Sequence, residues 1–453
     1  MTYRKYMTHA ICALTAALMV LPAAPASAWG PHTQITQAAL DVLDANDPLA
    51  RHLVDSFDQL ATYCWMPDYD RSIRKDTDGS LYYADDYLLF PEIQKHAAHA
   101  MPGVRSALEP FFRRSVQALR HETPVNAARW IGSLLHYTED SGAPPHARPG
   151  VADHGKMENW VDGESIGIAG YEPRLLGKTE DEALAGYLKR MDGLIAYSVE
   201  RAEKMAPFVK ADNRPAVEPI ALECANECSR VAADLLYTLG RIALSPTPDA
   251  AVFRGTTLTK ADAPADGRTA KIMMDGSNLS TLAEADGKFA LHNLTPGTYM
   301  GRILTPGCRM NRFTLRLEPG ETRNLNIMMV TLKPAGNLLR NPDLRIEWKT
   351  PGAPDCWLKT AAGWESDVVP VTAGDKYQLT IRWKKGGKGS AAVRWHTNLS
   401  PGLARSQSEA PVTQDRKDTV FAAPEGTASA CIVVKTEGEI TDAIETIVFA
   451  PVK

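Results

Sequence analysis

The sequence has few cysteines, little net charge and only one long apolar run. Each of these shortages counts against one class of protein. Seven cysteines in 453 residues are too few for a disulfide-built scaffold of this size. Beyond the N-terminus, no stretch approaches the roughly 20 apolar residues that a membrane-spanning helix needs. The formal net charge is -4 at pH 7, so the chain lacks the general attraction that nucleic-acid binders exploit, and no stable nucleic-acid complex is expected.

Several common catalytic and architectural signatures are also missing. The sequence contains no Gly-rich phosphate loop, no Ser-His-Asp arrangement and no internal repeat. Its composition, with 44% hydrophobic and 23% charged residues, is that of an ordinary globular protein. The length predicts two to four domains at roughly 100–200 residues each. Without a reason for self-association, a monomer is expected.

The one long apolar run lies in the first 28 residues and resembles a secretory signal. It follows two basic residues, spans 10–21, and precedes the small residues of the Ala-Ser-Ala triplet at 26–28. We expect cleavage after Ala28, which would release a secreted or periplasmic protein whose first residue is Trp29.

The pattern of the remaining sequence changes once, from helical spacing to short β-rich runs, and this predicts a multidomain protein. Residues 29–244 carry apolar residues at helical spacing, including a capping box formed by Thr179 and Glu182. A Pro-containing linker is expected at 245–250, followed by short β-rich runs separated by Gly, Pro and Asn turns. We therefore predict an all-α domain followed by two all-β sandwich domains, at 251–332 and 334–453.

The two predicted β-domains resemble known modules in short segments. Residues 286–299 are similar to the hairpin of carboxypeptidase-regulatory-like domains, and 337–341 with 377–381 resemble galactose-binding-like jelly rolls. Such modules imply contact with a membrane surface or with carbohydrate. Five of the nine tryptophans fall in the last domain. Exposed, they would serve such contacts, but burial in the sandwich core is the expectation.

The cysteines outside the signal form two pairs of interest. Cys224 and Cys228 stand four residues apart in a helical stretch, a spacing of about 5–6 Å between Cβ atoms that is too wide for a disulfide, so buried thiols are expected. Cys356 and Cys431 fall in one β-domain, and the sequence leaves open whether they form a disulfide.

A block of histidines and acids in the helical region carries the chemical signal. Eight of the eleven histidines lie between 29 and 244. His136 with Asp140, and His154 with Glu158, are both i,i+4 pairs, so each pair shares a helix face. His146 follows two prolines in the connecting loop. A single such pair is usually a surface contact, but two pairs bracketing a third histidine predict a metal site, since zinc takes imidazole and carboxylate ligands.

The block resembles the signature of bacterial zinc-dependent phospholipases C, His-Tyr-x-x-Asp-x-x-x-Pro-x-His followed by His-x-x-x-Glu. The resemblance covers about 29–244 and implies the helical fold of the phospholipase C/P1 nuclease superfamily with up to three Zn2+ ions. The related S1/P1-type nucleases usually carry Asp where Glu158 stands, which favours the phospholipase branch.

The resemblance also implies ligands outside the block. The family uses its mature N-terminal tryptophan through the free α-amine and carbonyl, which corresponds to Trp29. Its next histidine corresponds to His32. Its aspartate, which ligates metal and helps to deprotonate the attacking water, corresponds to Asp68, with Asp70 as the alternative.

The sequence departs from the family at one ligand. A histidine expected about 12–14 residues after the aspartate is missing, because those positions hold serine, leucine and Tyr82. His96, His99, Tyr82 and Asp85 are the candidate replacements, and one of the three zinc sites is in doubt for this reason.

The resemblance implies cleavage of a phospholipid into diacylglycerol and a phosphorylated headgroup. Two alternatives stay open: a nuclease or other phosphodiesterase that uses the same metal site, and a surface-binding protein whose enzyme domain is weak or degenerate.

Overall fold

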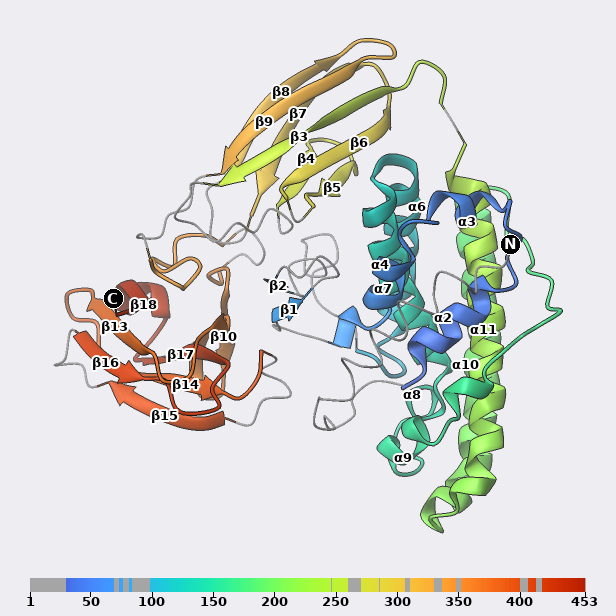
Figure 1. Cartoon of the computed structure of the whole chain (residues 1–453), viewed down its shortest axis with the longest axis horizontal. Coiled ribbons are helices and arrows are strands. Elements are labelled where there is room, and N and C mark those ends of the chain that lie inside the picture. Colours follow the sequence, from blue (N-terminus) through green and yellow to red (C-terminus); the bar gives the residue numbers. More distant parts are fainter. Residues whose placement is uncertain are drawn as a thin grey trace.

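The structure is a computed structural model of the whole chain. It describes residues 30–68, 73–75, 81–83, 98–245, 247–259, 270–284, 286–305, 310–329, 336–347, 352–399, 406–412 and 418–452. Within these ranges the N-terminal half is helical and the C-terminal part consists of β-sheets (Figure 1). None of the described helices is long and apolar enough to cross a membrane. The predicted signal peptide and Trp29 lie outside the described residues.

Four long helices build the helical part: α6 (Arg105–His121), α7 (Pro124–Gly142), α10 (Glu180–Lys210) and α11 (Arg214–Ala243). Two of these helices begin at a capping side chain that accepts a backbone N–H. Thr123 caps α7 ahead of a proline at its first position, and Thr179 forms the predicted capping box with Glu182 at the start of α10. Local sequence therefore determines where these helices begin.

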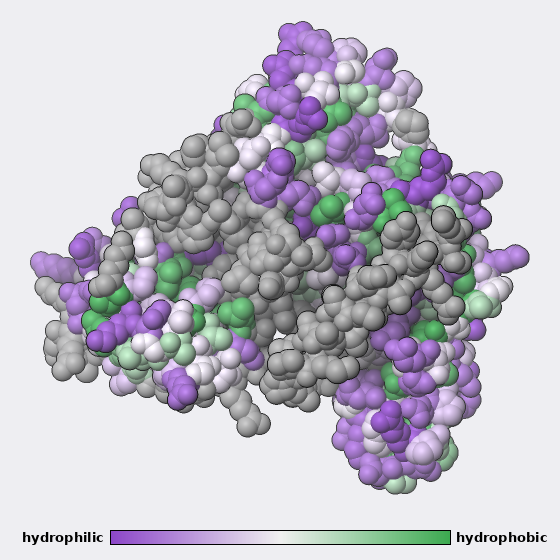
Figure 2. Space-filling view, in the orientation of Figure 1, coloured by the Kyte–Doolittle hydropathy of each residue, from purple (hydrophilic) through white to green (hydrophobic). Residues whose placement is uncertain are grey.

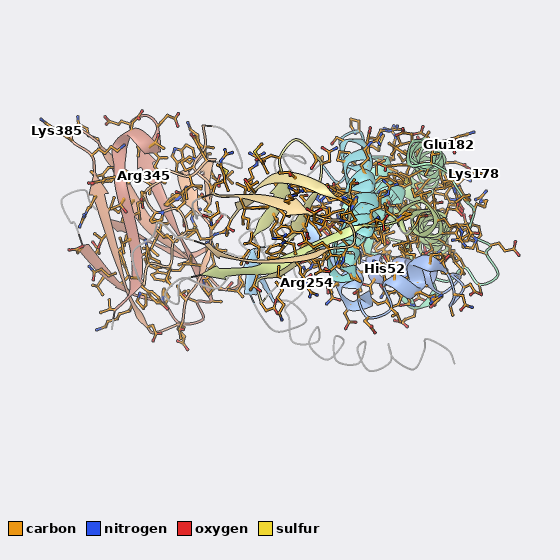
Figure 3. All side chains as sticks on the ribbon, turned by 90° about the horizontal axis from the view of Figure 1, so that it is seen from above. His52, Lys178, Glu182, Arg254, Arg345 and Lys385 are labelled. Atoms are coloured by element: carbon orange, nitrogen blue, oxygen red, sulfur yellow. The ribbon has the colours of Figure 1, made fainter. Side chains whose placement is uncertain are left out.

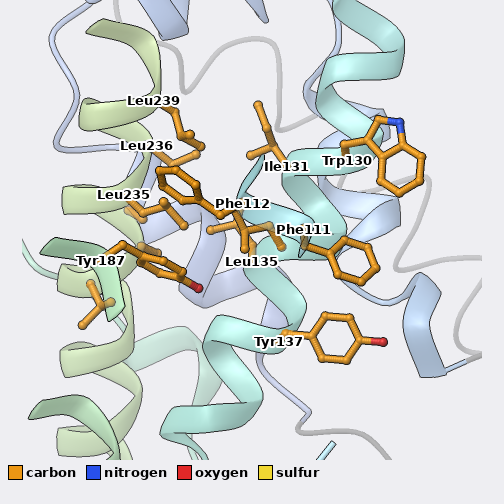
Figure 4. Packing of buried hydrophobic residues seen from close by; sticks show 14 of the residues in the cluster. Phe111, Phe112, Trp130, Ile131, Leu135, Tyr137, Tyr187, Leu235, Leu236 and Leu239 are labelled. Carbon is orange, nitrogen blue, oxygen red and sulfur yellow. The ribbon is translucent and has the colours of Figure 1, made fainter. Parts of the chain in front are cut away.

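The helices enclose one apolar core. Phe112 of α6 stacks on Tyr187 of α10 and points toward the leucines of α11, whereas Phe111 packs against Trp130 and Tyr137 of α7 (Figure 4). At roughly 1.5–3 kcal/mol for each fully buried large apolar side chain, this cluster supplies much of the driving force for packing the bundle. Trp130 of α7 belongs to the same cluster.

Glycines let two partners approach α7 closely. A Cβ on Gly132 would lie 2.6 Å from the carbonyl oxygen of Leu60, and one on Gly142 would lie 1.9 Å from the sulfur of Cys228. Larger residues would push away α4 (Phe57–Tyr63) and α11. Cys224 and Cys228 are buried free thiols, which confirms that expectation.

Short elements surround the bundle. They are α2 (His32–Leu40), α3 (Pro48–His52), the 3-10 turn η1 (Met66–Asp68), β1 (Ile73–Lys75), β2 (Leu81–Tyr83), α8 (Pro144–Ala147), α9 (His154–Asn159) and the 3-10 turn η2 (Gly163–Ser165). Strands β1 and β2 form a two-stranded antiparallel sheet. Helix α2 packs against α11 and α7, and this brings His32 close to α7.

The first β-part contains two sheets. Their strands are β3 (Ala251–Thr259), β4 (Lys271–Met274), β5 (Ser280–Leu282), β6 (Lys288–Leu294), β7 (Gly297–Leu304), β8 (Asn311–Leu317) and β9 (Thr322–Met329). One sheet has the order β6-β3-β9 and the other β5-β4-β7-β8. The β3–β9 pair is parallel and the remaining pairs are antiparallel.

The last part forms a second pair of packed sheets. Its elements are β10 (Trp357–Thr360), β11 (Gly363–Ser366), β12 (Val369–Pro370), β13 (Lys376–Trp383), β14 (Gly389–His396), β15 (Ser406–Val412), β16 (Asp418–Ala422), β17 (Ser429–Thr436), α12 (Ile440–Ala443) and β18 (Ile444–Pro451). The smaller sheet has the order β16-β13-β18, and the larger one contains β10-β11-β17-β14-β15 with β12 beside β17.

The tryptophans of this last part belong to its core. Trp357, Trp364 and Trp395 are buried in one apolar cluster, against which Trp383 packs in a half-buried position, whereas Trp348 lies outside the described residues. The buried rings are not available for sugar stacking or membrane contact. Cys356 and Cys431 are buried free thiols.

The first β-part is docked on the helical part. The side-chain amide of Asn126 donates to the carbonyl oxygen of Leu282 at 2.7 Å, and Arg129 pairs with Glu284 at 3.0 Å. Leu282 itself belongs to the apolar core of the helices. Seen from above, the strands of this part lie between the helices and the last sheets (Figure 3). The visible face carries hydrophobic residues scattered among hydrophilic ones (Figure 2).

Candidate metal centre

Helix α7 presents two inward-facing groups one turn apart. His136 and Asp140 are fully buried, and His136 Nε2 lies 3.0 Å from Asp140 Oδ2. His136 Nδ1 lies 2.8 Å from the carbonyl oxygen of Cys64, to which it donates its proton. The Nε2 lone pair therefore faces Asp140. Gly132 allows this arrangement, because it admits the helix that ends at Cys64 against α7.

His99 completes this group from the segment before α6. Its Nδ1 lies 2.7 Å from Asp140 Oδ2, 2.9 Å from His136 Nε2 and 3.4 Å from Asp68 Oδ1. His99, one of the four candidate replacements for the missing histidine, therefore lies at the site. His96 and Asp85 lie outside the described residues, and the Tyr82 side chain is likewise not described.

His32 enters from α2 on the other side of Asp140. Its Nε2 lies 3.6 Å from Asp140 Oδ1, and its Nδ1 lies 2.6 Å from Glu139 Oε2. Thr36, one turn along α2, donates its hydroxyl proton to the other oxygen of Glu139 at 2.7 Å. The Glu139 carboxylate thus holds the imidazole with Nδ1 protonated and Nε2 free, as metal-ligating histidines are commonly held.

Asp68, at the end of η1, brings a second carboxylate to the group. Its Oδ1 lies 3.7 Å from His136 Nε2. Burial raises the pKa of Asp68 to about 6, although the imidazoles of His136 and His99 oppose the shift. Asp70, the alternative, lies outside the described residues.

A second group forms where α8 meets α9. His146 Nε2 and His154 Nε2 lie 2.7 and 2.8 Å from the same oxygen of Glu158, and 3.2 Å from each other. Asp153 caps α9 by accepting the N–H of Lys156, and this fixes the helix turn that carries His154. The far nitrogen of His146 lies 3.1 Å from Asp140 Oδ1, so Asp140 joins the two groups.

The ligand atoms gather into three sets, each of which could hold a metal ion, and the first two sets share His136. The sets are His32 with Asp68 and His136; His99 with His136 and Asp140; and His146 with His154 and Glu158, with all ligand atoms of a set within 4.8 Å of one another. Seven of the eight residues predicted from the sequence thus lie together, and Trp29 lies outside the described residues.

The electrostatics of the centre depend on these close contacts. Burial by itself would raise the pKa of Asp140, but His136 and His146 lower it well below its ordinary value. Burial opposes protonation of His146, whereas Asp140 and Glu158 raise its pKa to about 10. Hydrogen bonds from His146 and His154 lower the pKa of Glu158 in spite of its burial. Without a cation, a proton on His146 balances part of the carboxylate charge.

The inward atoms lack ordinary partners, and this tests whether the set fits a metal. Among the described residues, three buried atoms of the centre have no hydrogen-bond partner: His32 Nε2, Asp68 Oδ2 and Glu158 Oε2. Leaving such a group unpaired costs about 1–3 kcal/mol. All carry lone pairs, and ligands about 2.0–2.1 Å from one tetrahedral zinc stand roughly 3.3 Å apart. The donor set and its spacing fit divalent metal ions.

The sequence did not single out two of the residues at the centre. Glu139 gave one usable signal, a carboxylate directly before Asp140 in a helix that is otherwise apolar on that side. His99 appeared only as one of four alternatives. Both act through contacts with residues more than 35 positions away, which spacing along one helix does not reveal.

Comparisons with known proteins do not assign a family. No family model and no curated protein matches the chain. Among solved structures, alpha toxin from Clostridium absonum is 14% identical, with 67% of this chain and 98% of that chain covered and a TM-score of 0.31. The alpha-toxin from an avian strain of Clostridium perfringens is 15% identical over 64% and 96%, with a TM-score of 0.27.

A third similarity concerns 22% of this chain. This part aligns with one chain of a cohesin–dockerin complex from Acetivibrio cellulolyticus at 14% identity and a TM-score of 0.18. The alignment covers 65% of the length of that cohesin–dockerin chain. At these TM-scores a shared fold or function is not established.

Proposed function

We propose that this protein is an exported zinc-dependent hydrolase of phosphoric diesters, of the phospholipase C type. The observation that carries the proposal is the cluster of three His/Asp/Glu groups, linked by the contact between Asp140 and His146, with buried lone pairs that have no partner. The sequence signature shared with zinc-dependent phospholipases C supports the choice of metal and reaction.

We expect the two groups of residues to hold separate metal ions. His32, Asp68, His136, His99 and Asp140 would hold ions on the α7 side, whereas His146, His154 and Glu158 would hold one at α9. When bound, zinc would lower the pKa of a coordinated water to about 7 and neutralise phosphate oxygens.

Trp29 is the proposed additional ligand, through its free α-amine after signal cleavage. Two residues separate Trp29 from His32, and a chain segment of that length spans at most about 11 Å. A Cβ on Gly30 would lie 3.9 Å from the side chain of Asn159, which places Gly30 beside α9, the helix that carries Glu158. A free amine on the residue before Gly30 is the proposed ligand for the second group.

Asp68 is the proposed general base. A pKa of about 6 makes its carboxylate ionised, yet still basic, near neutral pH. It would accept a proton from the attacking water as the water oxygen bonds to phosphorus. The bond from phosphorus to the alcohol oxygen breaks on the opposite side, and that oxygen takes up a proton. A phospholipid would yield diacylglycerol and a phosphorylated headgroup.

The test uses the mature protein that begins at Trp29. We expect release of a water-soluble phosphorylated headgroup from phosphatidylcholine or sphingomyelin vesicles, loss of activity with a chelator, and recovery with zinc. Asp68→Asn should lower kcat by about 10²–10⁴-fold, the usual contribution of a positioned base. His52→Ala, a histidine outside the centre, is the matched control.

The same samples decide between the alternatives. Cleavage of single-stranded nucleic acid with intact lipids would favour a nuclease. Zinc binding without cleavage of either substrate would favour a degenerate enzyme, in which case the protein acts by binding surfaces.

A further inference from the structure

A cavity of about 470 Å3 lies at the seam between α6 and the hairpin of β4 and β5. Arg114 and Gln117 line it from the helix, while Ser277 and Ser280 line it from the hairpin. These helix residues sit near the C-terminal end of α6, whereas His99 precedes its start. At 1.5 Å per residue, the length of helix between Arg105 and Gln117 is about 18 Å, so this cavity is separate from the metal centre.

Arg114 is a charged residue in the wall of this cavity, and it is unusual because it is only 4% exposed. The guanidinium carbon lies 4.3 Å above the ring of Trp130, and Nη1 donates to the buried carboxylate of Glu122. Nε and Nη2 have no hydrogen-bond partner within the described parts of the chain. These two nitrogens form one edge of the guanidinium, the edge that binds two oxygens of a carboxylate or phosphate at once.

The other unpaired polar atom at this wall is also a donor. Gln117 Nε2 is buried and lacks a partner among the described residues. The carboxylate at the rim, that of Glu180, is already engaged by Arg113 and Arg120 at 3.4 and 2.6 Å. The unpaired atoms of the residues that line the cavity are therefore donors that require oxygen acceptors, and the Nε–Nη2 edge of Arg114 suits a group that offers two oxygens.

We propose that the seam cavity binds a phosphate group, free or carried as a monoester, through the Nε–Nη2 edge of Arg114 and the amide of Gln117. Because α6 and the β4–β5 hairpin both line the cavity, its occupant strengthens the docking of the first β-part on the helices. The site is independent of the metal centre and of the proposed hydrolase activity.

The experiment is hydrogen–deuterium exchange on the full-length mature protein, titrated with inorganic phosphate and, separately, with glycerol phosphate. Sodium chloride at equal ionic strength is the blank. We expect saturable protection of residues 110–121 and 271–284. Tighter binding of the ester than of inorganic phosphate would identify an esterified ligand. Segment resolution matters, since phosphate bound at the metal ions would protect 132–158 instead.

Two variants keep the proposal testable if one is unstable. Arg114→Lys preserves the charge beside Glu122 but removes the two-pronged edge, and Gln117→Leu removes the amide donor. Each should weaken phosphate binding at the seam by about tenfold or more, the usual effect of losing a charge-assisted hydrogen bond. Arg105→Lys, an exposed arginine on the same helix, is the matched control. Protection confined to 132–158, or unchanged seam affinity in both variants, would overturn the proposal.

Discussion

Replacing Glu139 with alanine should loosen the metal centre without touching a proposed ligand. The change removes the acceptors of His32 Nδ1 at 2.6 Å and of the Thr36 hydroxyl at 2.7 Å. Both donors are buried, and each unpaired buried donor costs about 1–3 kcal/mol. Loss of a carboxylate whose pKa is raised by burial offsets part of this. We expect a net loss of about 1–3 kcal/mol in the free energy of unfolding.

The larger effect concerns the metal. Without Glu139, the His32 imidazole is no longer held with its free Nε2 toward Asp140, and loss of such a partner typically lowers metal affinity by about 10–100-fold. The assay measures zinc per protein after dialysis against graded chelator concentrations, beside thermal melts of the same samples. Glu139→Gln is the matched control, since its amide oxygen can accept from His32 while its amide nitrogen donates to Thr36.

One result would refute this reasoning. If Glu139→Ala retains all its zinc at the chelator concentrations that wild type tolerates, Glu139 does not position His32. Equal zinc loss in the alanine and glutamine variants would instead show that the charge of Glu139 matters, rather than its hydrogen bonds.

Four further outcomes are expected. Extra residues before Trp29 should lower zinc content and activity, because an amide nitrogen is a poor zinc ligand. His99→Ala should remove at least one ion and leave the α9 group loaded, as metal analysis can measure. The pKa of His146 is raised to about 10 in the metal-free protein, so zinc must displace its proton at neutral pH; apparent affinity at this group should rise about tenfold per unit from pH 7 toward 10. Asn126→Ala should cost about 1–3 kcal/mol in a denaturant melt, because the carbonyl of Leu282 loses its donor.

Each of these predictions has its own contradicting result. Equal zinc content in extended and native-start forms would exclude the N-terminal ligand. Wild-type metal content in the His99 variant would return the missing-ligand role to one of the other candidates. A pH-independent zinc affinity would mean that His146 is not a ligand. Asn213→Ala is the control for the Asn126 variant, since the exposed Asn213 makes no side-chain cap bond on α11; equal stability of the two variants would contradict the docking argument.

The docking of the first β-part also changes how its role should be tested. Cutting the chain after the helices would remove Leu282 and expose the part of the apolar core that it covers. It would also leave Asn126 and Arg129 without their partners. A truncated protein would then lose stability for reasons unrelated to its substrate. Point variants at the seam separate the two effects.

Much of the centre could be predicted from the sequence, because its signals are local. Helical spacing places His136 with Asp140 and His154 with Glu158 whatever the rest of the chain does. Caps and turn residues likewise mark where helices begin and where the β-rich part takes over. Short-range geometry of this kind depends on neighbouring residues alone, and the prediction of a metal site rests on it.

The tertiary structure decided what joins those local pairs. It places His99 at the site, because the segment before α6 returns to the face of α7 that carries Asp140. It adds Glu139, whose role depends on α2 packing beside α7. It also buries Trp357, Trp364 and Trp395 in the last sheets and places Leu282 in the helical core. These contacts join residues tens to more than a hundred positions apart, and they depend on how closely whole elements pack, which neighbouring residues do not specify.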